Sequence, residues 1–152
     1  MIANRKVVAW MMIALLAAAG CASQPAASGP APTVKMTQTS DVAIVQAAAG
    51  TAVPVDFRLS VTNPYQHNIT LQSVELETVG QSGSYSMKRV RQAFETIIPA
   101  GATTAVDIRA WVVPLQDTAQ GKIGNAVMLR GAARFDSQGA IVRSPFVARF
   151  GG

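Results

Sequence analysis

The sequence is poor in the side chains that most often build catalytic and metal sites. Among its 152 residues there is one cysteine, Cys21, and one histidine, His67. A single cysteine excludes an internal disulfide, so the fold must be stabilised by its core. His67 lies in a predicted turn without neighbouring cysteine or acidic side chains, which makes it a poor metal ligand. No local motif supplies the nucleophile and acid that a catalytic triad through His67 would need.

Two further patterns with chemical potential are weak. Residues 121–124, Gly-Lys-Ile-Gly, lack both the spacing of a phosphate-binding loop and the hydroxyl residue that follows its lysine. Glu75 and Glu77 lie on one face of a predicted strand, and a carboxylate pair is able in principle to act as acid and base. The simpler interpretation is a solvated strand face. We therefore predict a protein with no catalytic residue, cofactor, metal or small-molecule substrate, and not an enzyme.

The sequence also lacks a hydrophobic run long enough to cross a membrane as a helix. Residues 7–19 form an uninterrupted apolar stretch of thirteen, whereas a helical span needs about 20. Arg5 and Lys6 precede this stretch directly. A short apolar run behind basic residues is typical of a secretory signal.

The end of this run predicts a lipid anchor. Residues 18–21, Ala-Ala-Gly-Cys, resemble the lipobox of bacterial lipoproteins. The resemblance implies that residues 1–20 are removed and that Cys21 carries the diacylglycerol and a palmitate-type acyl chain. An ordinary signal peptide with an incidental cysteine, cut near Ala17 or Ala19, is the alternative. Ala22 resembles the residue found after the cysteine in outer-membrane lipoproteins, which implies the periplasmic face of a Gram-negative outer membrane.

Composition divides the remaining chain into two parts. Residues 21–32 consist almost entirely of small residues and proline, with neither charge nor apolar periodicity, so we predict a flexible tether. Residues 33–152 have the length of one ordinary domain.

The charge is modest and gives little indication of a partner. Loss of Arg5 and Lys6 with the signal lowers the formal net charge from +5 to +3. Lys88, Arg89 and Arg91 form the only cluster that is local in sequence. They are interpreted as a solvated strand edge or loop or, alternatively, as a contact with anionic lipid head groups. An excess spread this thinly favours no nucleic-acid partner.

The domain is organised around an alternating stretch, residues 52–63. Its apolar positions are Val53, Val55, Phe57, Leu59 and Val61. Alternation at every second position is typical of a half-buried β-strand and predicts that Phe57 is fully buried. Asn63 and Pro64 end the strand, because proline donates no hydrogen bond to a sheet. The apolar pattern resumes at Ile69, which predicts a hairpin around this turn.

Further strands follow the same logic. The apolar positions change phase between Leu71 and Val74, which predicts a β-bulge near residues 72–73. Gly139 supplies the positive φ of a turn, and Pro145 favours an edge position for the last strand. Seven to nine short strands, with residues 114–125 as a possible helical or irregular connection, predict an all-β protein. We expect an antiparallel sandwich of the immunoglobulin or fibronectin-III type.

Three apolar side chains are candidates for contact with a partner. Trp111 and Val113 share the polar face of their strand with Asp107 and Arg109, so either another segment covers that face or the two form an exposed apolar spot. Tyr65 lies at the predicted hairpin tip and is similarly ambiguous.

Two stretches carry a family resemblance. Residues 59–83, with the Asn-Pro turn between two strands and the following glycine loop, resemble the late-embryogenesis-abundant type 2 proteins, or WHy (water stress and hypersensitive response) domain. Residues 97–101 and 104–108 resemble the same family's proline turn and next strand. The resemblance implies a β-sandwich that protects labile client proteins or envelope structures during desiccation, cold or a related stress response. An envelope interaction module that docks a membrane complex is the alternative.

Overall fold

The computed structural model describes residues 29–40, 50–80, 84–115 and 126–150. These residues contain eight β-strands and no helix. The strands are β1 (Thr33–Gln38), β2 (Val53–Thr62), β3 (Ile69–Thr78), β4 (Tyr85–Ser86), β5 (Val90–Ile98), β6 (Thr103–Pro114), β7 (Val127–Ser137) and β8 (Ala140–Phe150). No helix of the described part is long and apolar enough to span a bilayer.

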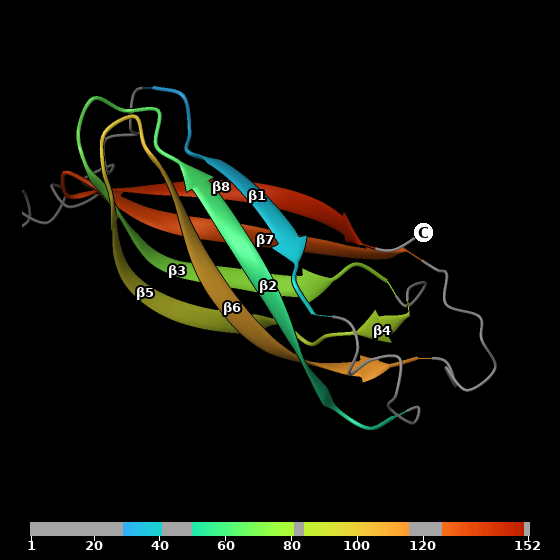
Figure 1. Ribbon diagram of the computed structural model, residues 1–152. Coiled ribbons are helices and arrows are strands. Elements are labelled where there is room, and N and C mark those ends of the chain that lie inside the picture. The colour runs from blue at the N-terminus through green and yellow to red at the C-terminus, as the bar shows by residue number, and fades with distance from the viewer. Residues whose placement is uncertain (1–28, 41–49, 81–83, 116–125, 151–152) are drawn as a thin grey trace, which may run out of the picture.

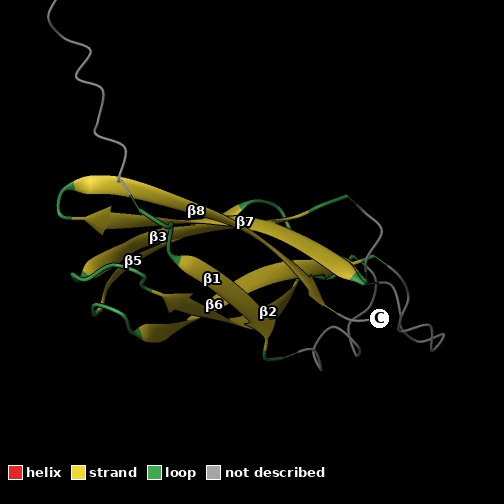
Figure 2. Ribbon diagram, turned by 90° about the horizontal axis from the view of Figure 1, so that it is seen from above, coloured by secondary structure: helices red, strands yellow, loops and turns green. Residues whose placement is uncertain are grey.

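The strands form two antiparallel sheets that face each other. One sheet has the order β1-β2-β6-β4 and the other β5-β3-β7-β8. The two layers are seen in Figure 1 and, from above, in Figure 2. The predicted all-β, antiparallel β-sandwich is therefore confirmed.

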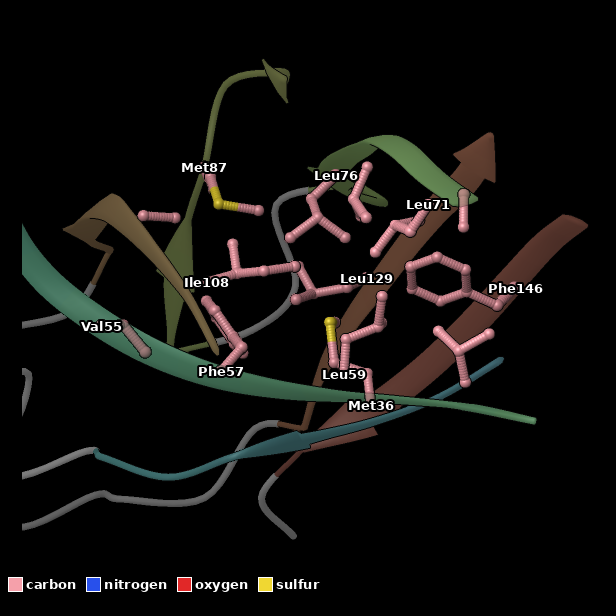
Figure 3. Packing of buried hydrophobic residues seen from close by; sticks show 14 of the residues in the cluster. Met36, Val55, Phe57, Leu59, Leu71, Leu76, Met87, Ile108, Leu129 and Phe146 are labelled. Atoms are coloured by element: carbon pink, nitrogen blue, oxygen red, sulfur yellow. The ribbon is translucent and has the colours of Figure 1, made fainter. Parts of the chain in front are cut away.

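The core lies between the sheets and is built from alternate positions of nearly every strand. Val55, Phe57, Leu59 and Val61 of β2 are fully buried, as the alternation predicts. Figure 3 shows Phe57 and Leu59 among Ile108, Leu129 and Met36 between the sheets. Because both sheets contribute apolar faces to one core, neither sheet buries its residues without the other.

The predicted hairpin around Asn63 and Pro64 is wrong. β2 pairs with β1 and β6, whereas β3 belongs to the opposite sheet. The fully buried Asn63 amide fixes this corner, since its Nδ2 donates to the carbonyls of His67, Ile98 and Pro99 at 2.8, 3.1 and 3.0 Å. The bonds to Ile98 and Pro99 attach the chain to the end of β5 and the turn that follows it, and the chain crosses from one sheet to the other.

Two other local predictions are confirmed. The register of β3 shifts between Leu71 and Ser73 against both of its neighbours, which is the expected bulge. Gln138 and Gly139 have φ values of 54° and 85°, and they join β7 to β8 in a tight hairpin. β8 lies at the edge of its sheet, as Pro145 predicts. An edge strand tolerates proline because one of its sides has no partner strand that needs a backbone donor.

Several predictions concern residues outside the described ranges. They are the signal segment 1–20, Cys21 and Ala22, the tether up to residue 28, and residues 116–125 of the connection between β6 and β7.

Candidate functional site

The outer face of the β1-β2-β6-β4 sheet carries an exposed apolar spot. Trp111 of β6 is 62% exposed, so no described segment covers it. It lies directly opposite Pro54 of β2 and two positions before the half-buried Val113. Pro54 is tolerated because the pairing of β1 with β2 starts at Phe57, which leaves this stretch of β2 without a neighbour from β1. We call Pro54, Trp111 and Val113 the Trp111 patch.

The charges beside the Trp111 patch are matched one to one across strands. Arg58 Nε binds Asp107 Oδ1 at 2.9 Å, and Arg109 Nε binds Asp56 Oδ1 at 2.6 Å. The hydrogen bonds from these arginines hold the pKa values of Asp107 and Asp56 below their ordinary range. The Trp111 patch is therefore bordered by neutralised ion pairs.

Tyr65 is remote from the Trp111 patch and is half-buried. It follows the end of β2 that is opposite to Pro54, and its ring lies against Gly29. The ring also stacks on His67, with centroids 5.1 Å apart. His67 Nε2 is 2.7 Å from Ser137 Oγ, so the sole histidine links the corner to the end of β7. Thus the structure does not bring Tyr65 together with Trp111 and Val113.

The outer face of the β5-β3-β7-β8 sheet holds Glu75 and Glu77, the candidate acid–base pair. Glu77 binds Arg89 at 3.1 Å and Arg130 at 2.6 Å, and Glu75 lies 3.8 Å from Arg91. The hydrogen bonds from Arg89 and Arg130 lower the pKa of Glu77. A carboxylate held ionised in this way is suited to ion pairing, whereas a general acid needs a raised pKa.

Arginines from several strands converge on this face, which is hollowed. Two adjoining hollows of about 680 and 380 Å³ share Glu75, Arg89, Ala132 and Arg143 in their linings. The arginines that line one or both are Arg89, Arg91, Arg130, Arg134 and Arg143, which we call the arginine face.

Sequence reasoning noted only the part of the arginine face that is contiguous in the chain. Arg89 and Arg91 belong to the predicted cluster, but Arg130, Arg134 and Arg143 were not connected to it. The available signal was the tight turn at Gly139, because a two-residue hairpin loop sets the register that places Arg134 opposite Arg143. No local signal predicts that β3, with Glu75 and Glu77, lies next to β7 in the same sheet.

Metal-binding chemistry is not evident in the part of the chain that the structure describes. No three His, Cys, Asp or Glu side chains converge there on a possible ion site.

Comparison with known proteins shows the fold alone. No family model matches the sequence, and no curated protein matches it. The X-ray structure of a structural-genomics target is similar over 80% of this chain and 85% of its own, with a TM-score of 0.55 and 11% identity. The solution structure of a protein from Arabidopsis thaliana is similar over 68% of this chain and 77% of its own, with a TM-score of 0.50 and 18% identity.

Proposed function

We propose that this protein is a lipid-anchored, non-enzymatic β-sandwich of the bacterial envelope that protects neighbouring proteins during water loss or cold. The observation that carries the proposal is the Trp111 patch, with a tryptophan that is 62% exposed on the outer face of a sheet. The resemblance of residues 59–83 to the WHy domain supports the same function.

The patch has the physical properties of a weak, passive holding surface. Drying concentrates proteins and exposes apolar surface in partly unfolded states, which aggregate faster than they refold. A small apolar patch buries little area, so each contact with a client is weak and reversible. The ion pairs Arg58–Asp107 and Arg109–Asp56 leave the surroundings of the patch without excess charge, so clients of either sign are able to approach.

The position of the patch fits an anchored protein. Gly29 lies against Tyr65, so the described chain begins at the corner end of the sandwich, while Trp111 lies toward the other end of β2. Figure 1 shows the corner after β2 and the C-terminus at opposite ends of the molecule. A strand of ten residues is roughly 30 Å long. A lipid on Cys21 would therefore be joined to the domain at the end away from Trp111.

The protective function is tested with residues 29–152 and an unrelated labile enzyme. We expect the domain to slow inactivation by freezing and thawing more than an equal mass of albumin, and Trp111→Ser to weaken this effect. Ile97→Ser is the matched control, because Ile97 is 61% exposed on the opposite sheet. Equal protection by albumin contradicts the protective function. Equal losses in both variants would show that the Trp111 patch is not the holding surface.

The anchor is tested separately in cells. Wild-type protein should incorporate labelled palmitate and fractionate with membranes, whereas Cys21→Ser should lose the label and remain an uncleaved precursor. Absence of label in the wild type would contradict lipidation, because Cys21 is the only cysteine.

Docking onto one envelope complex is the second candidate. The fixed geometry of the Trp111 patch favours it, because an exposed aromatic residue at a defined position is typical of interface anchors. Affinity capture of the tagged lipoprotein distinguishes the two functions. A single stoichiometric partner, lost in Trp111→Ser, would indicate assembly, and a diffuse set of clients would indicate protection.

A further inference from the structure

The arginine face contains an arrangement that is unfavourable without a ligand. Arg134 of β7 and Arg143 of β8 are directly opposite each other in the strand register, and both side chains are exposed. Like charges at directly opposed positions of an antiparallel pair destabilise the sheet. Arg91 and Arg89 line the same hollow, which adds further positive charge to it.

The carboxylates that line the hollows do not balance this charge. Five arginines and two glutamates line the hollows, which is an excess of three positive charges. Glu77 is shared between Arg89 and Arg130, and Glu75 pairs with Arg91. Arg134 and Arg143 make no ion pair with any described residue. Two guanidinium groups therefore remain available side by side.

The hollow beneath these arginines is lined by short, buried side chains. Ser73 and Ala132 have short side chains and are 4% and 8% exposed, and both lie on the lining. Ala132 is the register partner of Glu75 on one side and of Pro145 on the other. A compact group is therefore able to fit between the arginine side chains, where each guanidinium presents two donors.

One wall of the larger hollow is apolar. Pro145 and Val147 of β8 line it, and Val147 is 66% exposed. The hollow therefore offers a cationic side and an apolar side to the same occupant. This combination matches a ligand with an anionic head and an attached hydrocarbon part.

We propose that the arginine face binds a phosphate group, with Arg134 and Arg143 as its principal donors and the wall of Pro145 and Val147 in contact with apolar atoms attached to that phosphate. Phosphate fits better than a single carboxylate, because a phosphate monoester carries up to two negative charges and presents three oxygens to several guanidinium groups. The site is distinct from the Trp111 patch, since it lies on the outer face of the other sheet.

The test measures binding of two probes to the full-length chain in detergent at low ionic strength, by equilibrium dialysis. One probe is inorganic phosphate, and the other is a short-chain phosphatidic acid that is soluble as a monomer. We expect binding that falls at least about tenfold in R134Q/R143Q, because each lost bond to a charged group contributes more than a neutral hydrogen bond. Tighter binding of the short-chain lipid than of phosphate indicates a lipid head group as the source. Equal binding would overturn the apolar part of the proposal, because it would show that Pro145 and Val147 make no contact that adds to the binding of the phosphate group.

The control is K35Q/R149Q, which removes the same two charges. Neither Lys35 nor Arg149 lines the hollows. Equal losses in the two double variants would overturn the proposal, because they would show a general effect of net charge. Absence of binding of both probes at millimolar concentration would also overturn it. Melting curves of both variants establish that the fold is retained, and a conservative R134K/R143K variant should recover part of the binding.

Discussion

The two sheets of this sandwich have similar inner faces and very different outer faces. Inside, Phe57 of β2 and Phe135 of β7 are both fully buried, and each sheet contributes a row of aliphatic side chains. Outside, one sheet pairs each arginine with its own aspartate, while the other collects five arginines around two glutamates. The core constrains residues on one side of a strand only, so the alternate positions are free to specialise.

This difference would allow the two proposed functions to share a small domain. The face with neutralised charge exposes Trp111, and the face with excess charge surrounds two hollows. An apolar contact is favoured where charges are balanced, whereas a phosphate group is favoured where they are not. The structure thus separates an apolar surface from an anion-attracting one by the thickness of the sandwich.

The largest expected effect contrasts an inner with an outer position of the same strand. Phe57→Ala should lower the free energy of unfolding by about 3–5 kcal/mol, because it leaves a cavity in the shared core. Arg58→Ala should have a far smaller effect, since its ion pair with Asp107 is solvent-exposed. Urea or thermal unfolding of residues 29–152 measures both. Similar losses in the two variants would mean that the two faces of β2 are energetically alike.

A smaller effect is expected at Gly131 of β7, whose missing side chain would point toward Phe146, on the core side of the sheet that carries the arginine face. A Cβ there would overlap Phe146 Cζ and lie 2.7 Å from the backbone oxygen of Glu75. The phenyl ring is able to move but the strand backbone is not, so Gly131→Ala should cost about 1–3 kcal/mol. Unfolding midpoints measure the change. An unfolding midpoint equal to that of the wild type would show that the backbone of β3 moves away from the added methyl group at little cost.

The next prediction compares the ion pairs of the two outer faces as the pH is lowered. The pKa values of Glu77 and Asp107 are lowered by their arginine partners, so both groups stabilise the fold above their ordinary values of 4.5 and 3.8. That contribution is lost as the pH falls through the lower folded values. Glu77→Gln should melt below Asp107→Asn at pH 7, because Glu77 serves Arg89 and Arg130. Both variants should approach the wild type near pH 2, after its own carboxylates are protonated. Melting differences that persist unchanged in acid would contradict the ion-pair explanation.

The smallest expected effect has the opposite sign. Arg134→Gln should leave the melting temperature unchanged or raise it slightly, because it removes a like charge beside Arg143. Arg58→Gln should lower it slightly, since it leaves Asp107 without its partner. Calorimetry at low salt compares the two, and added salt should reduce both differences. A clear loss of stability in Arg134→Gln would show that this arginine serves the fold instead of a ligand.

Much of the local structure is determined by the sequence itself. Alternation of apolar residues predicts the strands and the burial of Phe57, the change of phase predicts the bulge near Ser73, and Gly139 and Pro145 predict a turn and an edge. Each of these depends on the conformation of a few neighbouring residues and on which side of a strand meets water. Such features are therefore readable along the chain.

The pairing of strands that are distant in the chain, and with it the complete arginine face, was decided only by the tertiary structure. The turn at Asn63 and Pro64 resembles a hairpin locally, yet the Asn63 amide binds carbonyls of Ile98 and Pro99, more than thirty residues away in the chain. Likewise, Arg91 and Arg134 line one hollow because β3 lies between β5 and β7. Pairing between distant strands depends on how both sheets together bury one core. The free energy of that burial comes from contacts between distant segments, so a local stretch of sequence does not predict it.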